Sequence, residues 1–352
     1  MKTLIHAEKL LDAGKPGKAF AFLKARKASG AEGRYLLGEC ARLTGDCRAA
    51  AAYYRQAVAL SSSKADVKCR ALNGLAASLR TLGLSGKALE AARQASRIAV
   101  EYGFEDLLLE ARLEHAMGLR AAGRLRMALS ELNKLYAEYR REGEPFGMAY
   151  IHWARGGLYR LQGRFGDSIR EFQSSADISR RLRDDSSLGY AYFGLAGVSR
   201  VAGDITASER YYRLAGRIFA KSHDLFARAY AFCGLANALR QKGELNEALG
   251  LYHQADSLYS RIGDRADLGF VKWGMGAVLE AQGLLRGALR HYRQSEQLFK
   301  GYSEARGLVL SGLRQASVLY LLGRTAEAER KYDAAVRLAR KEGLHTYLEH
   351  FT

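Results

Sequence analysis

The chain has 352 residues, and its 55 Lys and Arg against 37 Asp and Glu give a formal net charge of +18. This excess favours acidic surfaces, anionic peptides, nucleic acid or anionic lipid as partners. Only two prolines stand against 37 glycines, which disfavours a sheet protein and favours helices joined by short glycine turns.

The sequence disfavours membrane-spanning, secreted, zinc-binding and disulfide-rich proteins. No stretch is long enough to span a bilayer, and the apolar run at the N-terminus breaks within a few residues, against a secretory signal peptide. The four cysteines are too irregular for a zinc site and too sparse for a disulfide framework. We therefore expect a cytoplasmic protein without bound metal.

A repeat runs along the whole chain. Its anchor is a glycine followed five residues later by a small residue, and from Gly83 onward these glycines are spaced by 40 residues. A small residue stands seven positions before most of them, and an aromatic such as Tyr212 or Tyr252 often stands nine positions after. The anchor glycines are Gly14, Gly45, Gly83, Gly123, Gly163, Gly203, Gly243, Gly283 and Gly323.

Each repeat predicts a helix, a turn at a glycine with positive φ, and a second antiparallel helix. Small residues let the two helices approach closely, while the aromatic fills the wider gap to the next hairpin. Stacking of hairpins then buries a surface that no single hairpin could bury. We expect a single domain over residues 1–352, with repeats at about 1–30, 31–68, 69–108, 109–148, 149–188, 189–228, 229–268, 269–308 and 309–352.

The segment from Leu235 to Ala255, LANALRQKGELNEALGLYHQA, carries the complete pattern of small residues, turn glycine and aromatic. At these positions the chain resembles the tetratricopeptide repeat (TPR) family. The resemblance implies an all-α, right-handed α-solenoid, or superhelix, of about nine TPR-like antiparallel hairpins. The period of 40 exceeds the usual length of about 34, so we expect longer helices. This longer variety looks like the repeats of G-protein-regulating scaffolds and bacterial peptide-sensing regulators.

The resemblance further implies that the first helix of each hairpin lines a concave groove where ligands bind. Three residues before successive turn glycines stand Arg42, Arg80, Arg120, Arg160, Arg200 and Arg240, followed by Glu280 and Tyr320. A ladder of guanidinium groups would suit an extended acidic ligand, because each group can bind a carboxylate through paired hydrogen bonds. The alternative stays open that arginine is favoured there only by the helix dipole.

Aromatic residues occupy two neighbouring registers that face the groove in this family. They are Tyr35, Trp153, Phe193 and Trp273 ten residues before the glycines, and Tyr150, Tyr190, Tyr230 and Phe270 thirteen before. They could stack on a ligand, although aromatics at helical spacing also form cores. Gly194 and Gly274 directly follow Phe193 and Trp273, and Gly234 occupies the same register after Cys233; we expect close helix packing at these three glycines.

No catalytic motif is present, and His152 is an isolated histidine on a helix, so we expect neither an enzyme nor a cofactor. We expect an interaction scaffold or adaptor that binds an acidic peptide or protein segment in a basic, aromatic groove. The alternatives are single-stranded nucleic-acid binding in the same groove, a regulatory or assembly subunit of an enzyme complex, and self-association. The final residues, from Leu344 to Thr352, predict a partial helix that closes the last hairpin. The predicted ligand-binding residues are Arg80, Arg120, Arg160, Arg200, Arg240, Tyr150, Trp153, Tyr190, Phe193, Tyr230 and Trp273.

Overall fold

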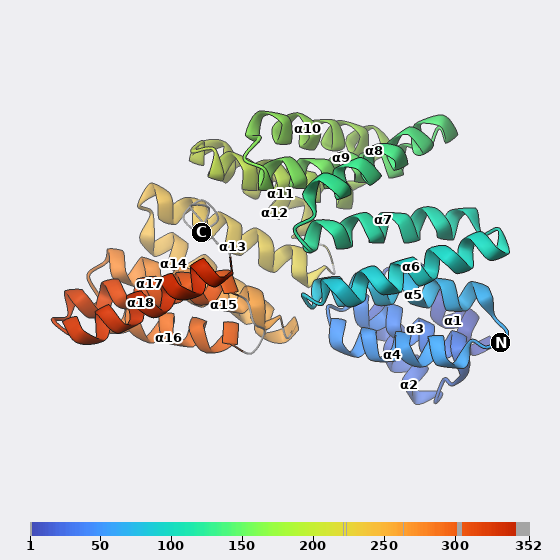
Figure 1. Ribbon diagram of the computed structural model, residues 1–352, viewed down its shortest axis with the longest axis horizontal. Helices are drawn as coiled ribbons and strands as arrows, with labels where there is room; N and C mark the ends of the chain where they lie inside the picture. The colour runs from blue at the N-terminus through green and yellow to red at the C-terminus, as the bar shows by residue number, and fades with distance from the viewer. Residues whose placement is uncertain (1, 221, 223, 263, 301–304, 343–352) are drawn as a thin grey trace. The chain divides into compact units, whose positions relative to one another are not determined.

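The polypeptide folds into α-helices that pair as antiparallel hairpins (Figure 1). The structure is a computed structural model, and it describes residues 2–220, 222, 224–262, 264–300 and 305–342. Over these ranges the chain forms eighteen helices and no strands. The partial helix predicted for residues 344–352 lies outside the described residues.

Each odd-numbered helix is the first of a hairpin, and the even-numbered helix after it is the second. From α5 to α11 every helix has 17 or 18 residues, which confirms the expectation of long helices. In chain order the helices are α1 (Lys2–Asp12), α2 (Pro16–Ala25), α3 (Gly30–Leu43), α4 (Cys47–Leu60), α5 (Ala65–Thr81), α6 (Ser85–Tyr102), α7 (Glu105–Ala121), α8 (Leu125–Glu142), α9 (Pro145–Leu161), α10 (Phe165–Leu182), α11 (Asp185–Val201), α12 (Ile205–Phe219), α13 (Leu225–Lys242), α14 (Leu245–Ile262), α15 (Arg265–Ala281), α16 (Leu285–Lys300), α17 (Ala305–Leu321) and α18 (Thr325–Lys341).

The turn inside each hairpin is made by the predicted glycine. All nine anchor glycines have positive φ, from 64° at Gly14 to 90° at Gly45 and Gly203. At Gly83 the turn closes with two hydrogen bonds: its amide donates to the carbonyl of Arg80 at 3.0 Å, and the amide of Leu84 donates to Leu79 at 2.9 Å. These are the bonds that end a helix at a left-handed residue.

An aromatic ring of the second helix fills the space between successive hairpins, as predicted. Tyr54 of α4 is fully buried. Its ring lies against Gly38 of α3 in its own hairpin and against Gly74 of α5 in the next, where a Cβ atom would come within 2.6 Å and 2.7 Å of Cε1. Tyr252 of α14 lies in the same way against Gly274 of α15. Close packing of a neighbouring ring therefore explains the absence of a side chain at Gly38, Gly74 and Gly274.

Contacts between residues divide the chain into two compact units, Met1–Ala191 and Tyr192–Thr352. The first unit contains α1 to α10, the second contains α12 to α18, and the division falls inside α11. A single continuous domain over residues 1–352 stays a prediction.

Candidate ligand-binding site

The arginines of the repeated register lie in the last turn of the first helices. Their backbone carbonyls accept hydrogen bonds from the turn glycines, as Arg120 does from Gly123 at 3.0 Å and Arg240 from Gly243 at 3.1 Å. All six side chains are half-buried. The six are Arg42 in α3, Arg80 in α5, Arg120 in α7, Arg160 in α9, Arg200 in α11 and Arg240 in α13.

The first two of these arginines are bonded to carboxylates. Arg42 donates to Glu39 of its own helix at 2.6 Å. Arg80 donates from two nitrogens to both oxygens of Glu114 in α7, at 3.1 and 3.3 Å, and this pair joins two successive hairpins. An acidic ligand would have to compete with Glu114 for Arg80, so Arg80 is less available than its place in the register suggests.

Arg120 lies among other arginines and has no carboxylate partner within the described ranges. Burial and the positive charges of Arg80 and Arg160 lower the pKa of Arg120 to about 10, although Tyr150 acts in the opposite direction. At neutral pH the side chain therefore still carries its proton. A half-buried cation next to two others is stabilised by any anion that reaches it.

Two residues of α9 hold the Arg120 guanidinium. Its central carbon lies 5.7 Å from the ring centroid of Trp153, a distance at which the ring face attracts a cation. A Cβ atom on Gly157 would come within 2.8 Å of a terminal nitrogen of Arg120, so the absence of a side chain leaves room for the guanidinium. Sequence reasoning singled out Trp153 and missed Gly157.

A pocket of about 530 Å³ opens beside Arg80 and Arg120. We call it the arginine pocket; its other lining residues are Met117, Ala121, Gly123, Leu125 and Leu161. Arg160 approaches Arg120 from α9, and its buried Nε has no hydrogen-bond partner among the described residues. The pocket thus combines cationic groups with apolar walls.

The repeat pattern did not point to the acidic side chains that lie next to these arginines. Glu110 of α7 accepts a hydrogen bond from Asn73 at 3.0 Å. Burial raises the pKa of Glu110, and the charges of Glu39 and Glu114 raise it further, although Asn73 acts against the shift. Glu110 stands thirteen residues before Gly123, the same register as Tyr150. The repeat spacing therefore places Glu110 on the face of the helix that was expected to line the groove. The first helices of this unit therefore carry charges of both signs.

In the second unit Arg240 lies beside Trp273. Its guanidinium carbon is 5.4 Å from the ring centroid of Trp273, and that of Arg314 is 5.7 Å from the same centroid. The Nε of Arg240 is buried and has no hydrogen-bond partner among the described residues. At the next position of the register, Glu280 accepts a hydrogen bond from Tyr292 at 2.6 Å and lies 3.8 Å from Arg314. Arg200 occupies the same register in α11 and is half-buried.

The predicted aromatic residues differ in exposure. Tyr150, Trp153, Tyr190 and Tyr230 are half-buried, and the rings of Tyr150 and Trp153 lie 5.5 Å apart beside Arg120. Phe193 is only 5% exposed and Trp273 only 3%. Phe193 packs against Phe219 at 5.4 Å and Tyr230 at 4.9 Å, as a core residue does. The half-buried rings could therefore stack on a ligand as they stand. Phe193 and Trp273 are buried and would have to move before they could contact a ligand.

Within the described ranges, no three His, Cys, Asp or Glu side chains come close enough together to bind a metal ion. The Nδ1 of His152 lies 2.7 Å from Glu171, which also pairs with Arg155 at 3.2 Å. Over the same ranges, no helix has the length and apolar character needed to cross a membrane.

Comparison with known proteins finds similarity in structure but not in sequence. No protein-family model matches the chain, and no curated protein matches it. A Rap protein complexed with competence and sporulation factor is similar with a TM-score of 0.69, 16% identity and coverage of 86% of each chain. The apo quorum sensor NprR from B. thuringiensis has a TM-score of 0.64 and 13% identity, over 96% of this chain and 97% of that one.

A third similar structure is a signal-transduction ATPase with a tetratricopeptide repeat sensor from Pyrococcus horikoshii. It has a TM-score of 0.63 and 14% identity, and the match covers 99% of this chain and 54% of that one. Together with the paired helices and positive-φ glycines, these likenesses define the class: the chain has the all-α, helical-repeat solenoid fold of TPR-type proteins.

Proposed function

We propose that this protein is an interaction adaptor that captures an acidic peptide or protein segment through arginines of its first helices. In the first unit the segment would place a carboxylate in the arginine pocket, next to Arg120, with Arg160 alongside. In the second unit Arg240 beside Trp273 would offer a similar position, and we expect Arg200 to contribute there. We further propose that the protein acts in the cytoplasm and binds without catalysing a reaction.

The observation that carries this proposal is the environment of Arg120. A cation held among arginines, with a lowered pKa and no carboxylate partner in the described ranges, is a position where an anionic ligand would relieve repulsion. Paired hydrogen bonds from a guanidinium to a carboxylate would add to that attraction. Trp153 and Gly157 hold the group in place, so little side-chain freedom is lost on binding.

The neighbouring carboxylates favour a peptide over nucleic acid. Glu39 and Glu114 are paired with arginines, but Glu110 on α7 forms no ion pair with a described residue, and a continuous phosphate backbone would be repelled by it. A peptide can place acidic residues at the arginines and basic or neutral residues at the glutamates. Among similar structures, one Rap protein is complexed with competence and sporulation factor and NprR is a quorum sensor, which supports ligand capture by repeats of this kind.

The experiment is a screen of an arrayed peptide library against the purified protein, followed by fluorescence anisotropy with the strongest peptide. We expect selected peptides to be enriched in Asp and Glu. The variant Arg120→Gln/Arg160→Gln should bind at least about tenfold more weakly, because each charge-assisted hydrogen bond contributes roughly 1.5–3 kcal/mol. The matched control is Arg124→Gln/Arg126→Gln, which removes two exposed charges close in sequence.

Three results would count against the proposal: selection of neutral or basic peptides, undiminished binding by the Arg120/Arg160 variant, or equal loss of binding in the control variant.

The nucleic-acid alternative is tested with a labelled oligothymidine of about twelve nucleotides, whose binding should fall steeply with salt if phosphates are contacted. Tight, salt-sensitive binding of the oligonucleotide with none of the peptides would replace the adaptor by a nucleic-acid-binding protein.

A further inference from the structure

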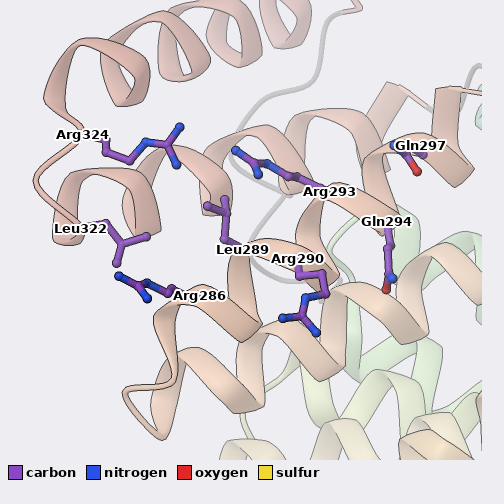
Figure 2. Close-up of a pocket in the computed structure, with 8 residues that line it drawn as sticks. All are labelled: Arg286, Leu289, Arg290, Arg293, Gln294, Gln297, Leu322 and Arg324. Atoms are coloured by element: carbon purple, nitrogen blue, oxygen red, sulfur yellow. The ribbon is translucent and has the colours of Figure 1, made fainter.

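A second basic pocket lies in the second unit, away from the register of Arg240. Its volume is about 570 Å³, a size typical of small-molecule sites. α16 supplies most of its lining and the turn before α18 supplies the rest (Figure 2). The lining residues are Arg286, Leu289, Arg290, Arg293, Gln294, Gln297, Leu322 and Arg324.

The guanidinium groups in this pocket greatly outnumber carboxylates. Figure 2 shows the ends of Arg293 and Arg324 pointing toward each other, with Leu289 and Leu322 nearby. Arg324 donates to both oxygens of Glu327, at 2.7 and 2.6 Å. Arg324, and to a smaller extent Arg330 and Arg293, hold the pKa of Glu327 below its usual range. One carboxylate thus lies among several arginines.

The acidic residue of α16 does not neutralise the arginines of the pocket, because it is bonded to other residues. Glu296 is the single acidic residue in this helix, and it is bonded to Lys331 at 2.7 Å, to Gln315 at 2.8 Å and to Lys300 at 3.0 Å. Arg286, Arg290 and Arg293 are exposed, and no described carboxylate forms an ion pair with them. They occupy positions i, i+4 and i+7 of α16, which places them along one side of the helix.

Inheritance of the repeat does not explain this cluster. Forty residues earlier, on α14, the equivalent residues are Asn246, Gly250 and His253. A further forty residues earlier, Arg213 of α12 corresponds to Arg293, but it is paired with Glu209 at 2.9 Å and with Glu247 at 3.5 Å. Arg210 of α12 corresponds to Arg290 and is also exposed, so only the combination of three arginines without an ion pair is particular to this hairpin among the three.

We propose that this pocket binds a phosphorylated small molecule, with a phosphate group held between Arg293 and Arg324, where it would compete with Glu327 for the Arg324 guanidinium. A phosphate dianion offers three oxygens and two charges, which match two opposed guanidinium forks better than a carboxylate with two oxygens and one charge. Leu289 and Leu322 would contact the carbon skeleton, and Arg286 would reach a second anionic group. This site is separate from the proposed peptide site and does not depend on it.

The test is isothermal titration calorimetry of the full-length protein with sodium pyrophosphate as probe, at constant ionic strength. Citrate is the comparison, because it carries several carboxylates at similar total charge. We expect pyrophosphate to bind at least about tenfold more tightly than citrate. The variant Arg286→Gln/Arg293→Gln should bind pyrophosphate at least about tenfold more weakly, through the loss of charge-assisted hydrogen bonds.

The control is Arg210→Gln/Arg217→Gln, which removes two exposed arginines from α12 in the same unit. It should keep pyrophosphate affinity within about twofold of the unaltered protein. The proposal is overturned if pyrophosphate produces no heat of binding, if citrate binds as tightly, or if the control loses as much affinity as the Arg286/Arg293 variant. Circular dichroism of each variant excludes unfolding as the cause, since all four substituted arginines are exposed.

Discussion

The ring of Tyr252 lies so close to the backbone of Gly274 that a Cβ atom on the glycine would come within 2.5 Å of Cε1. Tyr252 is on the second helix of one hairpin and Gly274 on the first helix of the next, so this contact sets how closely two hairpins stack. The same relationship joins Tyr54 to Gly74.

Substitution of Gly274 by Ala should lower the free energy of unfolding, because the fully buried Tyr252 ring has little room to move. We expect a loss of about 2 kcal/mol or more, as for other overpacked cores. Gly250→Ala is the matched control: Gly250 also lies within a helix, but a Cβ atom there would meet nothing within 4 Å. Gly250→Ala should stabilise the protein by roughly 0.5–1 kcal/mol in urea unfolding. Equal effects at the two positions would contradict the packing argument.

Arg120→Gln should raise the free energy of unfolding, even though it weakens capture of the proposed ligand. The substitution removes a half-buried cation whose pKa is lowered to about 10 by burial and by Arg80 and Arg160. The gain should be about 1 kcal/mol at pH 8, after allowance for the lost contact with Trp153.

The pH dependence gives an independent check on Arg120. Because the folded-state pKa is below the unfolded value, the destabilising effect of the charge is fully present below pH 10 and declines as pH rises from 10 toward the unfolded pKa. The stability difference between Arg120→Gln and the unaltered protein should therefore shrink above pH 10. A difference that is constant with pH, or a variant that is less stable at pH 8, would show that burial of the charge is not costly. Arg124→Gln, at an exposed position, should change stability by less than about 0.5 kcal/mol.

Arg80→Met should destabilise the first unit by about 2 kcal/mol, because Glu114 would lose both of its hydrogen bonds from Arg80 in a position only 14% exposed. The double variant Arg80→Met/Glu114→Leu should recover most of this loss, since no unpaired carboxylate remains. Urea unfolding of the two single variants and the double variant gives the coupling energy. Additive effects would mean that the pair contributes nothing specific to stability.

Glu296 should make the second unit sensitive to acid. Burial alone would raise the pKa of this carboxyl, but hydrogen bonds from Lys331, Gln315 and Lys300 outweigh it and lower the pKa to about 2. The stabilising contribution is therefore present above about pH 4.5 and is lost as pH falls toward 2. Since the side chain is 17% exposed, the contribution should be about 1–3 kcal/mol.

Urea unfolding between pH 2.5 and 6, followed by circular dichroism, tests this expectation. Glu296→Gln should be less stable than the unaltered protein at pH 6, and the two should converge as the pH falls. The substitution Glu329→Gln, at an exposed carboxyl of α18, should leave the pH profile nearly unchanged. A Glu296→Gln profile parallel to that of the unaltered protein at every pH would contradict the role of this carboxylate.

Much of the fold could be predicted because the repeat constrains it locally. A glycine at Gly83 predicted positive φ, and a small residue such as Gly276 predicted close approach of the two helices of a hairpin. In the structure the ring of Tyr292, on the second helix of the same hairpin, lies against Gly276. The arginine register was also evident, because each of these arginines stands three residues before a turn glycine. The partners of these arginines were not evident. Arg80 and Glu114 are 34 residues apart, and their pairing depends on the rotation of α7 about its axis relative to α5.

Taken alone, the amino-acid sequence determined the helical hairpins, their turns and the order in which small and aromatic residues pack. It could do so because backbone conformation and side-chain volume act between residues a fixed number of positions apart. Only the tertiary structure decided that Arg80 is neutralised while Arg120 is not, that Trp273 is buried, and that four arginines around Leu289 form a pocket. Burial and charge pairing are properties of neighbours in space, and helix packing, rather than the repeat spacing, chooses those neighbours.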